Sequence, residues 1–536
     1  MFGYLLPALL LSQAFGAYFV FRYLGFWTEQ DTAVFARIIT DMKDFGSLTS
    51  PGAYTHGYAY PIWAATLSDM TGLSVADLLQ LYTPLIGTLL LGIFSFATFR
   101  RLLASERLGL LATSLVFMVP ELVFTVSRGN HEKLTVSLTL LAMLALMNSY
   151  LEMYQKNRWP VFAAWVGVLY VTNFTLISLN SFFGSGFTVA SSLLLVFSAL
   201  IRFIKFRQGR KLAPVVRRLV IIVGINWLLI TLVLSYVYPS SSRNFQFVSS
   251  AQERIVELFR GAPEGEAGEA EEPSFVASDP YQVRETDWAN VRAYQVLSSF
   301  RWLLFLGSFI TALGLVIRVF RRLDTMLLQH LFLLAFYGAY AFILALAIPI
   351  DFLNLSAGTN LQVRMYTYFS VTAAPLLALG IASLLETLRP KKLKTAAIVV
   401  TATLLSGFTL ISMAKSTLDP TVSNRWLFYH PAEIQAMRFW DTKIWDVRDQ
   451  PGPLWIEVQG RLLFAYRTLY PNEPQRLNNF QMIHDIDTAH AMASPLFRES
   501  TVSWGRRTPP FWLNERTYDN GHVQIYHREP RTPLQR

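Results

Sequence analysis

Two carboxylates, Glu29 and Asp31, directly follow the aromatic pair Phe26-Trp27 where the first apolar run of the chain ends. A carboxylate at a membrane surface can take a proton from a substrate hydroxyl, as a general base does. From Thr32 onward, apolar residues recur at helical spacing, which predicts an amphipathic helix along the membrane interface. Asp31 then stands at the start of that helix, where it could instead act only as a helix cap.

A second polar cluster occupies residues 127–133, in a very short connection between two apolar runs. Its charged groups Arg128, Glu132 and Lys133 are therefore held at the membrane surface. The two cations can bind a phosphate, or they can anchor the helix ends by reaching toward lipid head groups. Glu121 adds a carboxylate inside the preceding apolar run, where charge is costly and usually faces a protein interior or a wet cavity.

A third cluster lies at residues 360–368. Its Arg364 is the only cation between Arg322 and Arg389, and a guanidinium is well matched to a phosphate through its paired donors. Arg364 is therefore a candidate clamp for a lipid phosphate, with interfacial anchoring as the alternative. Tyr366 is either part of the aromatic belt at the interface or a platform on which a sugar stacks.

The composition places these clusters in a membrane protein. Of the 536 residues, 53% are hydrophobic and only 15% are charged, whereas soluble domains carry roughly 25% charged residues. A helix needs about 20 apolar residues to cross a bilayer. The first such run could also be a cleaved signal peptide, although no Lys or Arg precedes Arg22. Eleven runs predict an all-α polytopic membrane protein with about 11 transmembrane helices, at residues 4–24, 79–99, 107–126, 133–151, 160–178, 186–204, 217–237, 299–317, 327–349, 367–386 and 395–414.

The positions of the cations indicate how the chain crosses the cell membrane. Lys and Arg gather in the loops after the second, fourth, sixth, eighth and tenth runs, so these loops are predicted to be cytoplasmic. The N-terminus is then cytoplasmic too, while the loops 25–78 and 238–298 and the segment after residue 415 lie outside. The net charge of +10 therefore reflects the cations of the predicted cytoplasmic loops and does not indicate nucleic-acid binding. Because the chain has no cysteine, disulfides and thiol nucleophiles are excluded.

The tail differs from the rest of the chain in its mixed periodicity. Residues 431–440 are predicted as a helix, and residues 454–458 and 523–526 as strands. The chain is therefore expected to divide into a membrane domain, residues 1–415, and a small mixed α/β extracytoplasmic domain, residues 416–536. The loop 25–78 is expected to carry interfacial helices.

This order of elements resembles the GT-C superfamily of membrane glycosyltransferases, which includes protein O-mannosyltransferases and lipid A aminoarabinose transferases. The similarity in sequence rests on Glu29-Gln30-Asp31, on Tyr54 to Pro61 in the same loop, and on Tyr518 to Tyr526 near the end of the chain. The resemblance implies transfer of a sugar, with inversion, from a polyprenyl-phosphate donor to a hydroxyl of a glycan, lipid or protein acceptor. The reaction would take place on the extracytoplasmic side, among membrane lipids.

The resemblance also implies roles for the three clusters. Asp31, with Glu29 beside it, would be the catalytic base, and Glu132 would orient the acceptor or share a metal ion with Asp31. Arg364, assisted by Arg128 or Lys133, would bind the donor phosphate. A divalent cation, Mg²⁺ or Mn²⁺, is left open because no Asp-x-Asp motif occurs in the loop 238–298. Further substrate contacts are predicted at His56, Tyr58, Tyr60, His131 and Tyr366.

Other classes share parts of this pattern. A lipid-linked saccharide flippase or polymerase would also need many spans, but it favours arginine-rich external loops, and the external loops here are acidic or neutral. A secondary transporter would carry ionisable groups near the bilayer midplane and broken helices in pairs. A non-enzymatic scaffold would depend on the tail alone, so deletion of residues 416–536 distinguishes it from an enzyme.

Overall fold

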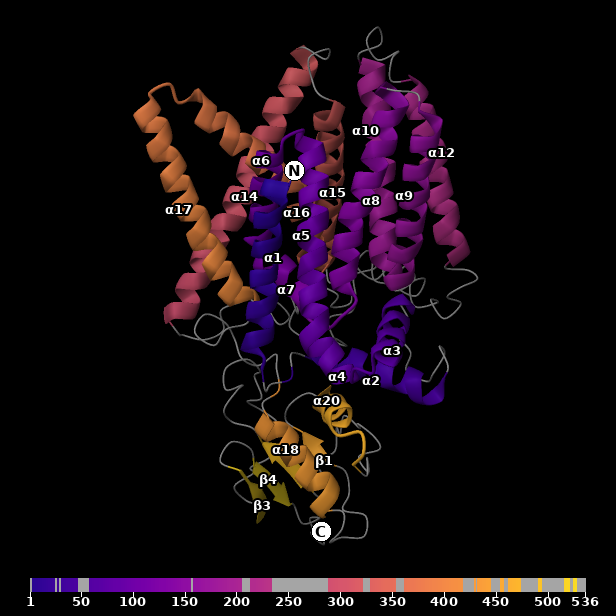
Figure 1. The fold of residues 1–536 in the computed structure, drawn as a ribbon, viewed down its shortest axis with the longest axis vertical. Coiled ribbons are helices and arrows are strands. Elements are labelled where there is room, and N and C mark those ends of the chain that lie inside the picture. The colour runs from indigo at the N-terminus through magenta and orange to yellow at the C-terminus, as the bar shows by residue number, and fades with distance from the viewer. Residues whose placement is uncertain are drawn as a thin grey trace, which may run out of the picture.

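A computed structural model gives the structure of the chain and shows one long helical bundle with smaller elements gathered beyond one of its ends (Figure 1). Two of the predicted site residues, Glu29 and His56, lie outside the described residues, as does most of the loop 238–298. The described residues are 2–24, 27, 30–46, 57–155, 158–204, 213–233, 288–321, 328–352, 361–417, 429, 431–444, 454–456, 461–473, 490–493, 515–520 and 524–527.

Long apolar helices form the bundle, and within the described residues each of the eleven predicted spans overlaps one of them or a bent pair. Backbone polar groups cannot remain unpaired in lipid, so apolar runs of this length fold as helices. Within the described residues, eight helices are long and apolar enough to cross a bilayer. The expected polytopic all-helical membrane protein is confirmed, while the total of eleven spans stays a prediction. The bundle helices are α1 (Phe2–Arg22), α5 (Thr83–Leu103), α6 (Glu106–Phe117), α7 (Pro120–Ser127), α8 (Glu132–Gln155), α9 (Trp159–Leu179), α10 (Ser181–Ile204), α12 (Ala213–Leu232), α14 (Trp288–Arg321), α15 (Leu328–Phe352), α16 (Leu361–Thr387) and α17 (Lys391–Ser416).

The predicted span 107–126 is not one straight helix, which corrects the expectation from sequence. α6 and α7 meet at an angle of 80°. Pro120 has no backbone N–H and its ring clashes with the turn before it in a continuing helix, so a new helix begins at this residue. The carbonyl of Phe117 at the end of α6 accepts a hydrogen bond from the Ser412 hydroxyl of α17 at 2.9 Å. The break is thereby stabilised by a neighbouring helix.

The segment between α1 and α5 folds into short helices at one end of the bundle. Figure 1 shows α2 lying across this end. The amphipathic helix predicted from Thr32 is α2, and Phe35, Ile39 and Met42 on its apolar face are buried. This face packs against α3 (Ala59–Thr71) and against α20 (Arg461–Leu469) of the C-terminal part, so protein covers it on both sides. The elements are α2 (Gln30–Phe45), α3 (Ala59–Thr71), α4 (Val75–Asp77) and the π-helical turn η1 (Leu78–Tyr82), which continues into α5.

The C-terminal elements lie at the same end as α2 (Figure 1). The helix expected at 431–440 is α18, and the strands expected at 454–458 and 523–526 are β1 and β4. The four strands form one sheet in the order β1-β2-β4-β3, in which β1 and β2 are parallel and the other neighbours are antiparallel. The elements are α18 (Pro431–Phe439), the π-helical turn η6 (Trp440–Ile444), β1 (Leu454–Ile456), α20 (Arg461–Leu469), β2 (His490–Ala493), β3 (Glu515–Asp519) and β4 (Gln524–His527).

A buried apolar cluster joins the first loop to the C-terminal elements. It is separate from the larger core inside the bundle, and it contains large aromatic side chains such as Trp27, Tyr60, Trp440 and Tyr466. The backbones of Trp27 and Tyr429 also exchange two hydrogen bonds, of 3.1 and 3.4 Å. Because burial of one large apolar side chain contributes about 1.5–3 kcal/mol, this cluster holds α2, α3, α18 and α20 as one unit against the bundle.

Candidate functional site

The polar cluster at residues 127–133 forms the turn between α7 and α8. α7 ends at Ser127, and Arg128 leaves the helix with an extended backbone at φ −68° and ψ 161°. Asn130 shapes the turn, because its Oδ1 accepts the N–H of Glu132 at 3.1 Å and its Nδ2 donates to the Glu132 carboxylate at 3.2 Å. Glu132 is thereby fixed in the first turn of α8, where the helix dipole favours a negative charge.

Four charged side chains from separate parts of the chain form a continuous series of ion pairs. The guanidinium of Arg128 donates to Oδ2 of Asp31 at 3.2 Å and also to the carboxylate of Glu132. Arg364, in the first turn of α16, approaches the other oxygen of Glu132 at 3.7 Å. All four residues are candidates predicted from the sequence, and the structure brings them together from α2, the α7–α8 turn, the start of α8 and α16. We call Asp31, Arg128, Glu132 and Arg364 the charged relay.

The members of the charged relay differ in their access to solvent. The side chains of Asp31 and Arg364 are 37% and 44% exposed, whereas those of Arg128 and Glu132 are 17% and 7% exposed. A buried carboxylate stays charged only with cationic and hydrogen-bonding partners, and the arginines and Asn130 supply them to Glu132. The relay therefore presents an accessible carboxylate at one end and an accessible guanidinium at the other.

The α7–α8 turn holds the start of α2 through Gly129. The N–H of Gly129 donates to Oγ1 of Thr32 at 3.0 Å, and its carbonyl accepts the hydroxyl of Tyr60 at 2.9 Å. A Cβ at position 129 would lie 2.5 Å from Cγ2 of Thr32, so a side chain cannot be added without moving one of the two segments. Since Thr32 directly follows Asp31, these contacts position the accessible carboxylate beside Arg128.

His131 lies buried behind the charged relay, against the ring of Phe35. Its Nε2 is 2.8 Å from Nδ2 of Asn180. Oδ1 of Asn180 accepts the backbone N–H groups of Phe182 and Phe183 at the start of α10, so the amide is oriented with its NH₂ toward His131. Nε2 must then accept a hydrogen bond, which makes the imidazole neutral with its proton on Nδ1.

The electrostatic surroundings agree with a neutral His131. Burial lowers the pKa of His131 from 6.5 to about 4; the nearby Glu132 opposes this shift, and the charges of Arg364 and Arg128 reinforce it. His131 therefore does not exchange a proton near neutral pH. Its predicted contact with substrate stays a prediction.

Lys133 is completely buried, which corrects the alternative that it anchors the helix at the lipid head groups. Its Nζ lies 5.7 Å from the centre of the Tyr60 ring, at a distance typical of a cation–π contact. Its stem packs against Gly87 of α5, where a Cβ would approach Lys133 to 3.4 Å. Lys133 and Tyr60 thus support the relay from inside the protein, and a direct contact of Lys133 with phosphate stays a prediction.

Two predicted substrate contacts lie apart from the charged relay. Tyr366 follows Arg364 by two residues and so lies on another face of α16, where the guanidinium of Arg301 is 5.9 Å from its ring centre. Tyr58 precedes α3 and packs against the apolar group of Ile177, Ile230 and Val233. The roles of Tyr58 and Tyr366 in substrate binding stay predictions.

Two residues that support the site, Arg301 and Asn180, were not predicted from sequence, whereas Tyr368 belongs to the predicted cluster at residues 360–368. Arg301 of α14 forms an ion pair with Glu121 of α7, and Tyr368 of α16 shares a hydrogen bond of 2.9 Å with Thr135 of α8. The signal for Arg301 was present, because a carboxylate inside an apolar run needs a partner and this arginine falls inside a predicted span. The contact of Asn180 with His131 had no such signal.

The carboxylates considered as metal ligands do not fit a divalent cation in this arrangement. The guanidinium of Arg128 already lies between Asp31 and Glu132 and donates to both. A metal ion at that place would meet the positive charge of Arg128 at short range, and Mg²⁺ and Mn²⁺ favour several oxygen ligands. Among the described residues, no group of three or more His, Asp or Glu side chains could hold a metal ion. No reaction step is therefore assigned to a metal.

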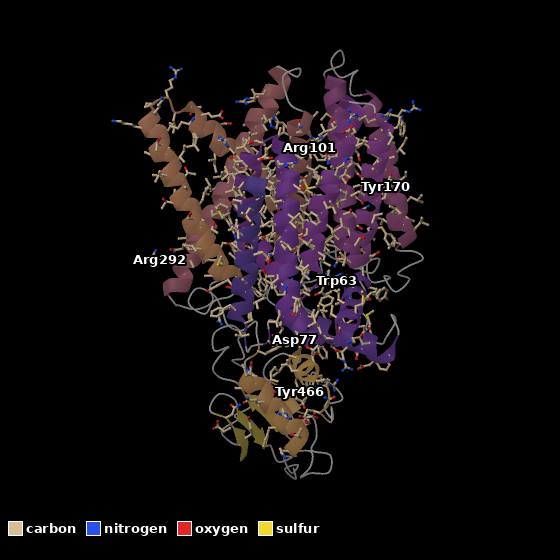
Figure 2. The ribbon with its side chains drawn as sticks, in the orientation of Figure 1. Trp63, Asp77, Arg101, Tyr170, Arg292 and Tyr466 are labelled. Carbon is tan, nitrogen blue, oxygen red and sulfur yellow. The ribbon has the colours of Figure 1, made fainter. Side chains whose placement is uncertain are left out.

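The site lies at one defined end of the bundle. Figure 2 shows Trp63 of α3 and Asp77 of α4 at the end that faces Tyr466 of α20, while Arg101 lies toward the opposite end. The helices between α1 and α5 and the C-terminal elements thus lie at the same end of the bundle, as the sequence predicts.

Solved structures are similar to this chain, whereas no protein-family model and no curated protein matches it. Oligosaccharyltransferase AglB from Archaeoglobus fulgidus, in complex with an inhibitory peptide and a dolichol-phosphate, has 11% sequence identity and a TM-score of 0.53 over 100% of this chain and 75% of that chain. The apo form of the A. fulgidus oligosaccharyltransferase has 12% identity and a TM-score of 0.50 over 90% of this chain. This chain spans 61% of the length of that apo structure. ArnT from Cupriavidus metallidurans, bound to undecaprenyl phosphate, has 12% identity and a TM-score of 0.40 over 98% of this chain and 97% of that chain.

The oligosaccharyltransferase likeness defines the class of fold. It extends over 90 to 100% of this chain, at 11 to 12% identity. The chain therefore shares the membrane fold of these oligosaccharyltransferases, and the GT-C-type fold that the resemblance implied is confirmed.

Proposed function

We propose that this chain is an integral-membrane glycosyltransferase that moves a sugar from a polyprenyl-phosphate donor to an acceptor hydroxyl. The observation that carries the proposal is the charged relay of Asp31, Arg128, Glu132 and Arg364. It offers a proton acceptor and a phosphate-binding cation at the two accessible ends of one connected arrangement. Transfer from a lipid phosphate to a hydroxyl needs both of these groups.

In the proposed reaction, the acceptor oxygen attacks the anomeric carbon of the donor sugar while the bond from that carbon to the phosphate oxygen breaks. Asp31 takes the proton of the hydroxyl, and the polyprenyl phosphate leaves with the bonding electron pair. Attack from the face opposite the phosphate inverts the anomeric carbon, and one carboxylate is sufficient for such a single displacement. Arg364 offers paired donors to the negative phosphate.

Arg128 and Glu132 are assigned to positioning. Glu132 is nearly buried and contacts both arginines, so it orients Arg364 toward the donor and Arg128 toward Asp31. This arrangement favours an indirect role for Glu132 over direct contact with the acceptor. Arg128 in turn fixes the Asp31 carboxylate at the start of α2.

The fold supports the proposal by analogy. The AglB structure of the same fold contains a dolichol-phosphate and an inhibitory peptide. In that protein, the fold therefore binds a lipid phosphate together with a second molecule.

We propose that the site faces the extracytoplasmic side. Arg100 and Arg101 at the end of α5 and Lys391 at the start of α17 belong to the end of the bundle opposite α2 (Figures 1 and 2). Cations in short loops favour the cytoplasm. This orientation also makes the N-terminus cytoplasmic and the C-terminal elements extracytoplasmic.

Asp31→Asn tests the proposal, because the amide keeps the size of the carboxylate and cannot take the proton. Transfer by membranes supplied with polyprenyl-phosphate-linked mannose, arabinofuranose or aminoarabinose should fall by about 10²- to 10⁴-fold. Asp44→Asn is the matched control, since Asp44 is exposed near the other end of α2. An Asp31→Asn protein that retains transfer would remove Asp31 from the role of base.

A lipid-linked saccharide flippase is the second candidate, and one observation favours it. The α6–α7 span is broken, and the buried carboxylate of Glu121 pairs with Arg301 just beyond the break, as ionisable groups do along transport pathways. Vesicles containing the purified protein and a fluorescent polyprenyl-phosphate sugar separate the two functions. A flippase would move the lipid between leaflets without an acceptor and would still do so after Asp31→Asn.

A further inference from the structure

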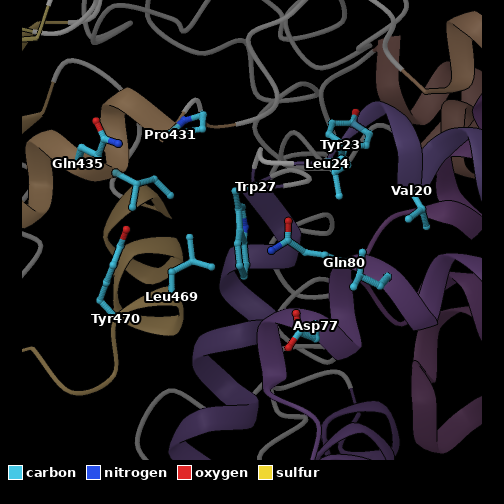
Figure 3. A pocket seen from close by; sticks show the side chains of 12 residues that line it. Val20, Tyr23, Leu24, Trp27, Asp77, Gln80, Pro431, Gln435, Leu469 and Tyr470 are labelled. Atoms are coloured by element: carbon cyan, nitrogen blue, oxygen red, sulfur yellow. The ribbon is translucent and has the colours of Figure 1, made fainter.

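A pocket lies where the end of the bundle meets the C-terminal elements. Its volume is about 310 Å³, at the lower end of the range for small-molecule sites. Its walls come from the end of α1, from α4 and η1, and from α18 and α20. Figure 3 shows the ring of Trp27 standing between Leu469 on one side and Gln80 on the other.

The indole of Trp27 is the most informative group in this pocket. Trp27 is 1% exposed, and its Nε1–H has no hydrogen-bond partner within the described structure. A buried donor without an acceptor costs about 1–3 kcal/mol, so a ligand oxygen that accepts from Nε1 would recover this energy. The backbone hydrogen bonds with Tyr429 fix the main chain of Trp27, and its burial in the apolar cluster restrains the ring, so the donor is positioned before a ligand arrives.

The other polar groups of the pocket offer both donors and acceptors. The amides of Gln80 and Gln435 can each donate and accept, and the carboxylate of Asp77 accepts. Tyr23 and Tyr470 add aromatic surface to that of Trp27. Rigid aromatic faces combined with a few oriented hydrogen-bonding groups suit a ring that carries several hydroxyls.

Charge excludes an anionic occupant. None of the described residues that line the pocket carries a positive charge, and Asp77 would repel a phosphate or a carboxylate. An extended hydrocarbon tail would leave the amides of Gln80 and Gln435 without partners in the pocket, which costs free energy. A neutral, hydroxyl-rich ligand fits both constraints.

We infer that this pocket binds a neutral saccharide, and that the acceptor of the transferase is therefore a glycan with one of its non-reacting sugar rings seated against Trp27. The assignment of the bound sugar as part of the acceptor rests on the proposed function. The binding of a sugar by the pocket does not. Trp27 precedes Asp31 by four residues, so their Cα atoms are separated by at most about 14 Å. A short oligosaccharide can thus occupy the pocket and present a hydroxyl near Asp31.

Saturation-transfer NMR of the full-length protein in detergent micelles tests the inference. The probes are the methyl α-glycosides of mannose, galactose, glucose and arabinose, together with a neutral Ser/Thr-containing peptide. At least one glycoside should receive saturation. Trp27→Phe keeps an aromatic ring and removes the N–H, so it should weaken binding of that glycoside by about 2- to 10-fold.

Matched variants make each outcome decisive. Trp302→Phe makes the same chemical change at an exposed position of α14 and should leave binding unchanged. Gln435→Ala alters an exposed wall residue of the pocket and should also weaken binding of the glycoside. It tests the inference on its own if Trp27→Phe does not fold. Absence of saturation for every glycoside, equal binding by wild type and both pocket variants, or preferential binding of the peptide would each overturn the inference.

The same experiment separates failure of this inference from failure of the proposed function. Asp31 and Arg364 do not line the pocket. The variants Asp31→Asn and Arg364→Ala should therefore bind the glycoside like wild type while losing transfer. Loss of sugar binding in the pocket variants without loss of transfer would leave the transferase intact and reject the acceptor assignment. Sugar binding without any Asp31-dependent transfer would leave a saccharide site in a protein of another activity.

Discussion

Glu121 at the start of α7 and Arg301 of α14 form an ion pair. Arg301 also lies 5.9 Å from the ring centre of Tyr366 on α16. α7 leads directly into Arg128, and α16 carries Arg364 two residues before Tyr366. The pair thus ties together the two helices that deliver the cations of the site.

Arg301→Gln should destabilise the protein strongly, because it leaves Glu121 buried without its counter-charge. Breaking a buried ion pair in this way costs about 3–5 kcal/mol. The double variant Glu121→Gln/Arg301→Gln should recover most of that loss, since neither amide needs a counter-charge. Apparent unfolding temperatures in detergent, compared at one scan rate, measure the effect. Simple addition of the two single effects in the double variant would contradict the coupling.

Gly129→Ala should reduce transfer by separating α2 from the α7–α8 turn. The new Cβ would lie 2.5 Å from Cγ2 of Thr32, and a displacement of about 1 Å at a reacting group can cost about 10²-fold in rate. Thr32→Ser removes Cγ2, so Thr32→Ser/Gly129→Ala should regain part of the activity. Gly167→Ala is the control, because nothing lies within 4 Å of a Cβ there. Full activity of Gly129→Ala would show that the turn tolerates the shift.

Acid should destabilise the protein through His131. The folded protein binds this proton with a pKa of about 4, compared with 6.5 for an unperturbed histidine, so below pH 6.5 the unfolded chain binds a proton that the folded protein excludes. The contribution of neutral His131 to the free energy of unfolding is complete above pH 6.5. It is lost as the pH falls toward 4, where the loss reaches about 3 kcal/mol. Apparent unfolding temperatures measured between these pH values should depend less on pH in His131→Asn. Identical profiles for wild type and variant would refute this expectation.

Arg364→Ala should weaken binding of the donor lipid. Hydrogen bonds to a charged phosphate contribute about 1.5–3 kcal/mol, which corresponds to a loss of roughly 10- to 150-fold in affinity. Arg364→Lys should bind the donor lipid with an affinity between those of wild type and Arg364→Ala, because an ammonium keeps the charge and lacks the paired donors of a guanidinium. Binding of undecaprenyl phosphate to the protein in nanodiscs measures the effect.

Arg292→Ala is the matched control for Arg364→Ala, since Arg292 is an arginine of α14 that contacts Gln295 outside the relay (Figure 2). Unchanged affinity in Arg364→Ala would return Arg364 to the role of an interfacial anchor.

Much of the scaffold could be predicted from sequence because the bilayer imposes simple rules. Apolar runs long enough to span the membrane had to become helices, and the spacing of Phe35, Ile39 and Met42 was sufficient to predict α2. Pro120 itself indicates a break in the helix, but the continuous apolar run 107–126 favoured one unbroken span. The covering of α2 by α20 had no signal, because contacts between distant segments do not alter local periodicity.

The candidate site residues were easier to select from the sequence than their partners. Asp31, Arg128, Glu132 and Arg364 attracted attention because charge at a membrane surface requires an explanation. Their pairing depends on how α2, α8 and α16 pack, which the sequence alone does not reveal. Asn180 shows the limit most clearly, because its pattern is that of an ordinary helix cap, and only the packing of α10 against the turn brings its NH₂ to His131.

The alternating signs of the charged relay have a consequence for the proposed transfer. Asp31 begins negative and ends neutral when it takes the proton, while the phosphate gains one negative charge as the sugar departs. One elementary charge is thereby carried from the α2 side to the α16 side, and the total stays constant. Arg128 and Glu132 already place fixed charges between these two sides. In solution, water would have to reorient as the charge moves, and the permanent charges replace that reorientation.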